Sequence, residues 1–194
     1  MFVLTLDQAG SRKDEDRVPA FLDSVADVPM VRRFERTVGD EMQGVTDDPS
    51  AVRDIALRAL RDGRWHIGIG SGTVQLGESA REGSGDAYVH AREAVDRAKG
   101  ATRFTPSIAM IGPNSDAAGE AEALLRLLGA MIQDRTDAQW EAIDAHRAGQ
   151  TVGEISARLS ISAEAVSQRR GYGRQVIEES CWPLVDRLLA ETEA

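Results

Sequence analysis

A mixed-sheet α/β fold followed by a small all-α domain is the architecture that this sequence predicts. Over roughly the first 130 residues, short apolar segments with strand propensity alternate with segments of helical periodicity. Two of the strand-like segments are separated by a tight turn, which predicts a hairpin. After Thr136 the strand signals stop, and the remaining pattern is typical of helices and turns. We therefore expect an α/β domain at residues 1–134 and a helical domain at residues 135–194.

The first elements are predicted by apolar runs and by the residues that end them. Phe2–Leu6 is rich in strand formers, and the turn-forming segment Gln8–Ser11 follows it. Apolar residues then recur at helical spacing from Val18 to Val25, after a charged stretch. A buried strand followed by a helix is the expected start of the α/β domain.

A hairpin is expected next, beyond Pro29. Met30–Thr37 and Glu41–Val45 are both strand-like, and the turn around Gly39 and Asp40 separates them. Because so short a connection joins antiparallel neighbours, these two strands should pair directly.

A helix and a strand follow the hairpin. The segment Asp47–Ser50 has the composition of a helix entry, the apolar residues from Val52 to Leu60 mark one helix face, and Gly63 ends the helix. Trp65–Val74 alternates apolar and small residues, which predicts a strand. The polar, glycine-rich segment that follows, up to Gly85, is expected to be a loop.

The remaining elements of this domain are a helix, a strand and a helix. Asp86–Lys99 is ended by Gly100, Ser107–Ile111 is a short apolar strand, and Ala118–Ile132 is rich in Leu and Ala. The order is therefore β-α-β-β-α-β-α-β-α. Two short crossover connections within it favour a ferredoxin-like core.

Capping residues delimit the helices of the C-terminal domain. Thr136 can cap a helix over Asp137–Arg147, and Thr151 with Glu154 forms the pattern of a capping box. A short helix, Glu154–Leu159, and a second helix capped by Ser162 are then joined by a turn of a few residues. Such a pair predicts a helix-turn-helix, with a shared core formed by Ile155, Leu159, Ile161 and Val166.

In a DNA-binding helix-turn-helix the second helix enters the major groove by its N-terminal part. Ser and Gln side chains can bond to base edges and Arg169 can pair with guanine, while Arg147 and Arg158 could reach backbone phosphates. Double-stranded DNA is therefore the expected partner. The residues predicted to contact it are Arg158, Ser162, Ser167, Gln168, Arg169, Arg170 and Arg174.

The segment from Gln150 to Gln168 resembles the helix-turn-helix of sigma-factor region four and related regulators, over about 20 residues. The alternative reading of these helices is an all-α dimerisation or packing module. The tail, Gln175–Glu191, carries many apolar residues and is interrupted by Pro183. It is a candidate for pairing with a second subunit, so a homodimer is expected.

Carboxylates follow strands at two places in the α/β domain. Asp7 ends the first strand, and Asp40 and Glu41 lie at the hairpin tip. If these strands are neighbours, the acids meet at one edge of the sheet, where they could bind Mg²⁺ together with water and substrate phosphates. The backbone N–H groups around Gly10 and Ser11 could hold a phosphate. The alternative is that these acids only form turns.

This domain resembles class III nucleotide cyclases and, more distantly, GGDEF diguanylate cyclases. The resemblance rests on Asp7–Gly10, Arg36–Asp40, His66–Gly72 and the segment from Gly85 to Ala98. It implies that Asp7 and Asp40 bind metal and that Arg36 stands at the purine-selecting position. The Asn and Arg that cyclases carry after the fourth strand are replaced by His90 and Ala94, unless Arg92 or Arg97 substitutes for that Arg.

A resemblance to the SatD family covers nearly the whole chain, and members of that family also end in a helix-turn-helix. It rests on motifs that occur in the same order, namely Asp7, Ser11 with Arg12, Arg17, Gly39–Gln43, Gly68–Gly72 and Ala91–Ala94. Ser11, Arg12 and Arg17 could grip phosphates beside Asp7, and the alternative is that they form a solvated helix start.

The bulk composition limits the function classes. A net charge of −9 argues against a protein that coats nucleic acid nonspecifically, and no apolar run approaches the ~20 residues of a membrane helix. A single cysteine fits a cytoplasmic location. The expected function is a DNA-binding transcriptional regulator with a non-catalytic, cyclase-like sensor or dimerisation domain. The alternative is a metal-dependent nucleotidyl cyclase or transferase that uses Asp7 and Asp40.

Overall fold

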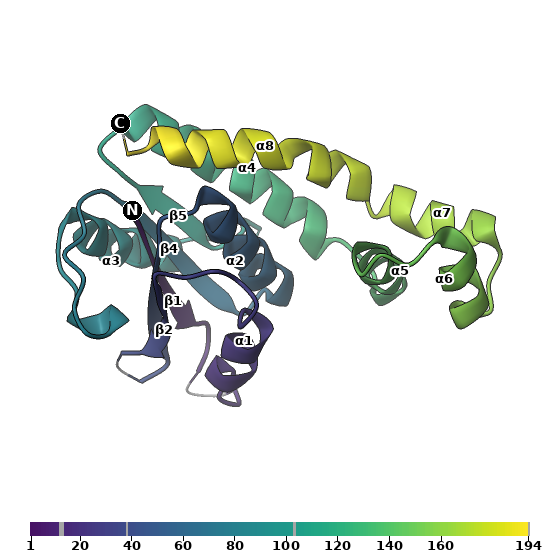
Figure 1. Ribbon diagram of the computed structural model, residues 1–194, viewed down its shortest axis with the longest axis horizontal. Coiled ribbons are helices and arrows are strands. Elements are labelled where there is room, and N and C mark those ends of the chain that lie inside the picture. Colours follow the sequence, from purple (N-terminus) through teal and green to yellow (C-terminus); the bar gives the residue numbers. More distant parts are fainter. Residues whose placement is uncertain (12–13, 38, 103, 194) are drawn as a thin grey trace. The chain divides into compact units, whose positions relative to one another are not determined.

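The computed structural model describes residues 1–11, 14–37, 39–102 and 104–193. Within these residues it has a five-stranded mixed sheet and eight α-helices, so the predicted mixed α/β fold is confirmed (Figure 1). In chain order the elements are β1 (Phe2–Gln8), α1 (Val18–Ser24), β2 (Arg32–Arg36), β3 (Glu41–Thr46), α2 (Pro49–Asp62), β4 (Trp65–Ser71), the 3-10 turn η1 (Ala80–Glu82), α3 (Asp86–Lys99), β5 (Ile108–Ile111), α4 (Ser115–Gln133), α5 (Asp137–Arg147), α6 (Val152–Leu159), α7 (Ala163–Tyr172) and α8 (Gln175–Glu191).

The chain divides into two compact units. The α/β unit comprises Met1–Ala130 and Pro183–Ala194, and the helical unit comprises Met131–Trp182. The first boundary lies close to the predicted one at residue 134. The assignment of residues 183–194 differs from the predicted domains, because the second half of α8 belongs to the α/β unit.

The sheet has the order β2-β3-β1-β4-β5. β1 is antiparallel to both of its neighbours, β2 and β3 form the predicted hairpin, and β5 is parallel to β4. The register places Glu41, Asp7 and His66 directly opposite one another across β3, β1 and β4. Since residues that are directly opposite point to the same side of a sheet, these three side chains share one face.

Helix α3 covers the face that carries this row. It approaches β4 so closely that a methyl group added at Gly68 would collide with backbone atoms of Ala91 and Val95, and one at Gly70 with those of Ala87 and Ala91. The glycines of the His66–Gly72 segment therefore serve helix packing in this structure. Alanines on α3, including Ala87 and Ala91, pack against the sheet beside Val3 and Val45.

Helices α1 and α2 lie on the opposite face. Phe21 of α1 packs on Trp65 of β4 with ring centroids 5.0 Å apart, and also contacts Phe34 of β2. A methyl group at Gly129 of α4 would meet Leu60 of α2, so these two helices are neighbours. The main apolar core lies between the sheet and these helices and contains Leu4, Leu6, Ile55, Leu60, Ile67 and Ile69.

The C-terminal segment is tied into the α/β unit. Val185 and Leu189 are fully buried, and Asp186 forms an ion pair with Arg53 of α2. The carbonyl oxygen of Thr192 accepts hydrogen bonds from Ser71 and Asn114. These buried contacts explain why the last residues belong with the sheet.

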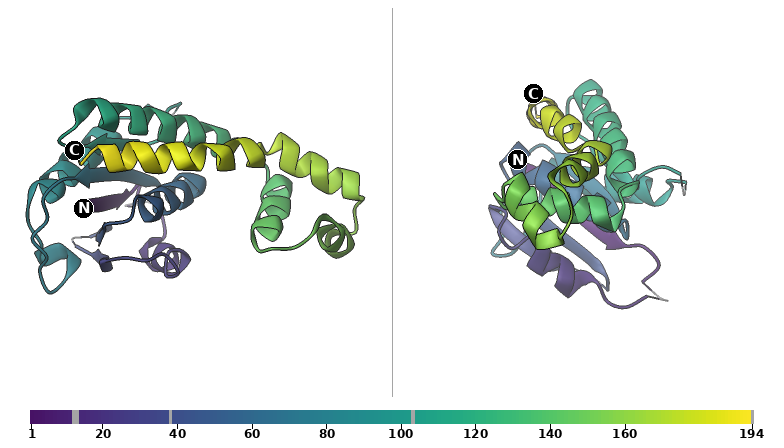
Figure 2. Two further views of the ribbon diagram at one scale, coloured as in Figure 1. Left: turned by 45° about the horizontal axis from the view of Figure 1, so that its top comes forward. Right: turned by 90° about the vertical axis from the view of Figure 1, so that its right-hand side faces the viewer.

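The prediction that Pro183 interrupts the tail is wrong, because α8 continues through it as one helix (Figure 2). A proline inside a helix costs a backbone hydrogen bond. Here the helix is held by buried residues before and after that position, Glu178 on one side and Val185 on the other. No helix in the described ranges is long and apolar enough to cross a membrane.

Candidate functional site

The helices of the helical unit begin at the predicted caps. Thr136 and Gln139 form a capping box at α5, and Thr151 and Glu154 form one at α6. At α7, the backbone N–H of Ala165 donates to the Ser162 hydroxyl at 3.1 Å. Each cap satisfies N–H groups that have no partner inside the helix, which fixes where the helix starts.

Helices α6 and α7 are joined by three residues and share the predicted core. Ile155 and Val166 are fully buried together with Ala145 of α5, and Val152, Leu159 and Ile161 pack against them. The turn is sharp because Ser160 adopts the left-handed conformation, with φ of 54°. The Ser156 hydroxyl donates to the Ile161 carbonyl oxygen at 2.5 Å and closes this turn.

One half of α7 faces solvent. At 3.6 residues per turn, the exposed residues fall on a single continuous side, and Val166 lies on the other. None of the exposed residues is Lys or Arg. They are Ala163, Glu164, Ser167, Gln168, Gly171 and Tyr172.

Two of the four side chains that carry hydrogen-bonding groups on this exposed side are already engaged. The Ser167 hydroxyl donates to the Ala163 carbonyl oxygen at 3.0 Å. The Glu164 carboxylate accepts from its own backbone N–H and from the Ser162 hydroxyl, and these bonds lower the pKa of Glu164 below its ordinary value. The carboxamide of Gln168 forms no hydrogen bond with any described residue, so both its donor and its acceptor remain available.

The predicted DNA-binding arginines divide into two groups. Arg169 pairs with Glu141 of α5 at 3.3 Å, and the Nε of Arg170 donates to Gln175 at 2.7 Å; both side chains are half-buried. Arg158 and Arg174 are exposed and form no ion pair or side-chain hydrogen bond with the described residues. The second pair is therefore better placed to meet phosphates.

A buried ion-pair network, absent from the sequence prediction, holds the helical unit together. Glu178 at the start of α8 is 1% exposed and accepts from Arg135 at 2.7 Å and from Arg147 at 2.8 Å. Arg147 also pairs with Glu179, so it is not directed at an outside phosphate. Arg135 and Glu178 are 43 residues apart and match no periodic pattern, so no sequence signal pointed to them.

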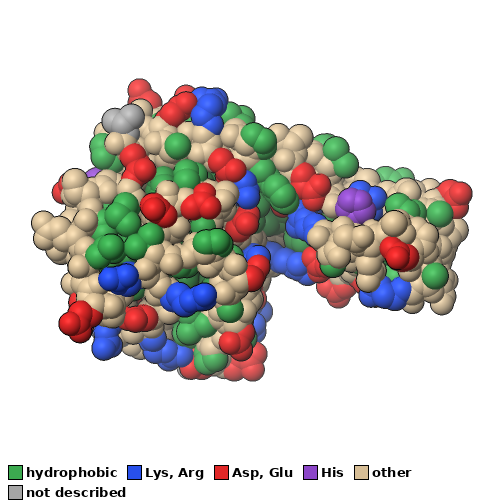
Figure 3. Space-filling model, in the orientation of Figure 1, with side chains coloured by type: hydrophobic (Ala, Val, Ile, Leu, Met, Phe, Trp, Pro, Cys, Tyr) green, Lys and Arg blue, Asp and Glu red, His purple; other side chains and the backbone are tan. Residues whose placement is uncertain are grey.

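Charge on the helical unit is mixed. Residues 131–182 contain six arginines and eight carboxylates. On the face seen in Figure 3, the Lys and Arg side chains alternate with Asp and Glu and do not form a continuous basic surface. Any DNA contact by this unit therefore depends on a few positions.

The carboxylates of the α/β unit come together as predicted for neighbouring strands. Asp7 of β1 lies opposite Glu41 of β3 and opposite His66 of β4. Asp40 precedes Glu41 in the hairpin turn, and its charge, like that of Asp7, acts on His66. The row therefore combines carboxylates and one imidazole at one end of the α3-covered face.

Cations from α3 balance this row. Lys99 lies 3.3 Å from Asp7, and Arg92 lies 3.3 Å from Glu41, which also accepts from the Thr37 hydroxyl. Neither His66 nor Lys99 was singled out from the sequence as part of a site. Lys99 stands at the end of a helix, where a cation also suits the helix dipole, so its position alone carried no signal.

His66 is held in one tautomer. The Ser107 hydroxyl donates to the Ala98 carbonyl oxygen at 2.8 Å, so its oxygen accepts from Nδ1 of His66 at 2.7 Å and leaves Nε2 as the acceptor. Burial is the largest influence on the pKa of His66 and lowers it. The charge of Lys99 also lowers this pKa, whereas the charges of Asp7 and Asp40 raise it. The net effect favours a neutral ring.

Gly10, Ser11 and Arg36 are among the predicted phosphate-binding residues that the structure describes. Arg36 pairs with Asp16 and donates to the Gly39 carbonyl oxygen at 2.9 Å. Gly10 is exposed in a turn with φ of 74°, and Ser11 follows it. Arg12 lies outside the described residues.

Few side chains that could bind a metal ion lie close together in the described part of the chain. Among the residues that the structure describes, no three His, Cys, Asp or Glu side chains gather as a metal centre. Ala94, at the position of the cyclase arginine, is fully buried, and the Nδ1–H of His90 donates to the Ser71 carbonyl oxygen. Arg97 contacts Glu122 and Met110, so Arg92 is the arginine that reaches the carboxylate row.

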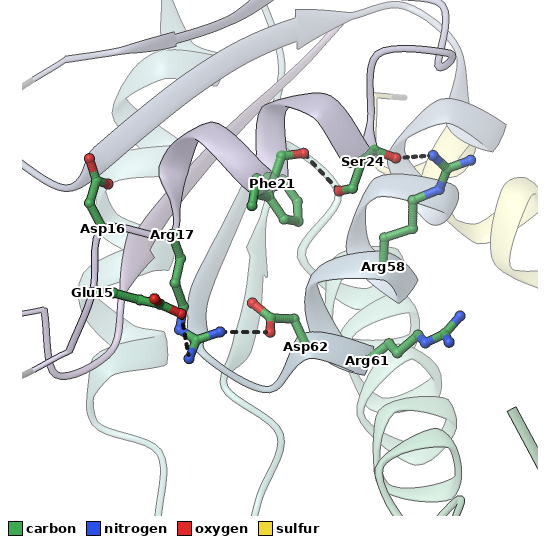
Figure 4. A pocket seen from close by; sticks show the side chains of 9 residues that line it. Glu15, Asp16, Arg17, Phe21, Ser24, Arg58, Arg61 and Asp62 are labelled. Atoms are coloured by element: carbon green, nitrogen blue, oxygen red, sulfur yellow. Dashed lines mark hydrogen bonds and ion pairs between the residues drawn. The ribbon is translucent and has the colours of Figure 1, made fainter. Parts of the chain in front are cut away.

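A separate surface pocket of about 750 Å³ lies between α1 and α2 (Figure 4). Arg17 pairs with Asp62 and Asp14, and Arg58 pairs with Asp27. These ion pairs join lining arginines to carboxylates in the lining or beside it. Among the described residues predicted to bind metal, phosphate or DNA, Arg17 lines this pocket.

No protein-family model, curated protein or solved structure matches this chain.

Proposed function

We propose that the protein is a DNA-binding transcriptional regulator that contacts double-stranded DNA through α6, α7 and Arg174, which precedes α8. The observation that carries this proposal is the exposed half of α7, presented by two capped helices that a three-residue turn joins around a common core. In the helix-turn-helix arrangement the second helix provides such a face for the major groove. Arg158 and Arg174 supply exposed cations for phosphates.

Duplex binding by the full-length chain at several salt concentrations tests this function. Each phosphate contact contributes about −0.9 to the slope of log K against log salt concentration. We expect Arg158→Gln and Arg174→Gln each to weaken binding and to make the slope less negative by about 0.9. Arg187→Gln, which removes an exposed arginine from the α/β unit, is the control. Absence of duplex binding at low salt contradicts the proposal.

The α/β unit is assigned a sensor or assembly role. Its connectivity β1-α1-β2-β3-α2-β4 with the neighbour order β4-β1-β3-β2 supports a ferredoxin-like core of the kind found in nucleotide cyclases. The placement of Asp7 opposite Glu41 is consistent with this resemblance. The same motifs, together with the α6–α7 pair, support a kinship with the SatD family.

The proposed regulator is a homodimer that pairs through the start of α8. Val176 and Ile177 are exposed apolar side chains at the start of α8. The neighbouring carboxylates, Glu178 and Glu179, are paired with arginines of their own chain, so two copies would not meet as like charges. Two-fold pairing would present two α7 helices. Sedimentation should show a dimer that Ile177→Glu makes monomeric; a monomer at all concentrations contradicts this part.

A metal-dependent nucleotidyl cyclase or transferase is the second candidate function. It is favoured by the placement of Asp7 opposite Glu41, with Asp40 next to Glu41 in the hairpin turn, since Mg²⁺ often uses one or two carboxylates with waters and substrate phosphates. Lys99 would have to leave Asp7 for this to occur. Incubation with each nucleoside triphosphate and Mg²⁺ or Mn²⁺ is the test. Turnover that Asp40→Ala abolishes would establish the activity; no turnover removes the candidate.

A further inference from the structure

The exposed side of α7 limits which bases it can read. This step rests on the DNA-binding function proposed above. Guanine offers two acceptors in the major groove and is recognised mainly by arginine or lysine. The arginines of α7 are half-buried against Glu141 and Gln175, and the six exposed residues of this helix include no cation. Guanine recognition by α7 is therefore disfavoured.

Gln168 is a side chain on this face whose carboxamide donor and acceptor are both free of hydrogen bonds with the described residues. Its carboxamide carries an NH2 donor group and a carbonyl acceptor in fixed geometry, and adenine presents the complementary acceptor N7 and donor N6. Ala163 and Gly171, on the same side, are small, and space around Gly171 is open. Small neighbours allow the helix backbone to come close enough for a side chain of this length to reach a base edge.

Glu164 lies one helical turn before Gln168 on the same side, so the two face adjacent base pairs. Its carboxylate is exposed and only accepts hydrogen bonds. Next to guanine it would oppose two acceptors, whereas cytosine offers the N4 donor. A repulsive group of this kind contributes to specificity by exclusion.

We propose that α7 recognises an adenine through Gln168 and that Glu164 excludes guanine from the contacted strand of the adjacent base pair. Both residues are specificity-determining groups on one helix face. The sequence suggested that Arg169 pairs with guanine. In this proposal the base contact of α7 is made instead by Gln168, and the base is adenine.

Selection of duplexes from a randomised library by the full-length chain, at low salt, tests this inference. The wild-type motif should contain an adenine that Gln168→Ala no longer selects, with the other positions unchanged. Glu164→Gln should admit guanine beside it. Ser167→Ala is the matched control, because that hydroxyl is bonded to the Ala163 carbonyl oxygen, and its motif should equal that of the wild type.

A modified base separates loss of the contact from loss of folding. Replacing the selected adenine by 7-deaza-adenine removes the N7 acceptor, and wild-type affinity should fall roughly 5-fold or more, whereas Gln168→Ala should not respond. A guanine-centred motif lost in Arg169→Ala, or an unchanged motif in Gln168→Ala, overturns the inference and leaves DNA binding standing. Failure to enrich any duplex overturns both.

Discussion

At the scale of single residues, the environment decides what a charged group can do. Asp7 and Glu41 were predicted as metal ligands, and the register does bring them together. The structure adds Lys99, Arg92 and the neutral ring of His66 to the same row. Each of these two carboxylates has a cation of its own chain 3.3 Å away. The carboxylate row is therefore an ion-paired cluster in this structure.

The titration of His66 tests the arrangement of this row. We expect its pKa in the folded protein to lie below the ordinary value of 6.5, because burial disfavours the charged ring. Asp7→Asn should lower it further, and Lys99→Gln should raise it, since each variant removes the charge that acts in the other direction. Imidazole NMR signals followed through pH measure this. Equal pKa values in all three proteins would contradict the geometry.

The same shift has a consequence for stability. The unfolded chain binds the His66 proton more tightly than the folded protein does. The contribution of the neutral His66 ring to the free energy of unfolding is therefore fully present above a pH of about 6.5, and it declines as the pH falls below that value. The free energy of unfolding should therefore decrease on acidification, and part of that decrease should be absent from His66→Gln.

At the scale of elements, contact between a helix and a strand depends on two glycines. Gly68 and Gly70 face α3 with no room for a side chain. Gly68→Ala should lower the free energy of unfolding by about 1–3 kcal/mol or more, because the helix backbone must move. Gly119→Ala, in an exposed part of α4 with open space around it, should raise it by up to about 1 kcal/mol. Chemical denaturation measures both, and equal effects would contradict this packing.

The buried ion pair is the second test at this scale. Glu178→Gln keeps the side-chain volume but leaves the Arg135 cation without its carboxylate, which should cost about 3–5 kcal/mol. Glu179→Gln is the control, because that carboxylate is partly exposed and should cost under about 1 kcal/mol. Hydrogen exchange in α5 and α7 should report the difference. A cost below 1 kcal/mol for Glu178→Gln would mean that the pair is not buried in solution.

At the scale of the whole molecule, α8 contributes to both units. Its later residues are buried in the α/β unit, so the sheet depends on residues that come last in the chain. Leu189→Ala should destabilise the α/β unit by about 2–5 kcal/mol, and Leu184→Ala, at an exposed site of the same helix, by less than about 1 kcal/mol. Hydrogen exchange in β1 and β4 distinguishes the two variants. Similar protection in both would contradict the assignment of this segment.

Local patterns determined much of this architecture. Apolar runs placed the strands and helices, turn residues placed the β2–β3 hairpin, and side-chain caps placed the starts of α5, α6 and α7. These features depend on interactions within a few residues, so they can be derived from the chain alone. The core of α6 and α7 followed from the same periodicity.

Tertiary structure alone decided which polar groups are engaged. The sequence offered Arg147, Arg169 and Arg170 as cations for DNA, but their partners come from other helices, up to 32 residues away. It also suggested a break at Pro183, where packing on both sides maintains one helix. Periodicity determines which side of an element is apolar. The partner of a charged side chain, and hence whether it remains available for a ligand, is determined by three-dimensional contacts between distant segments.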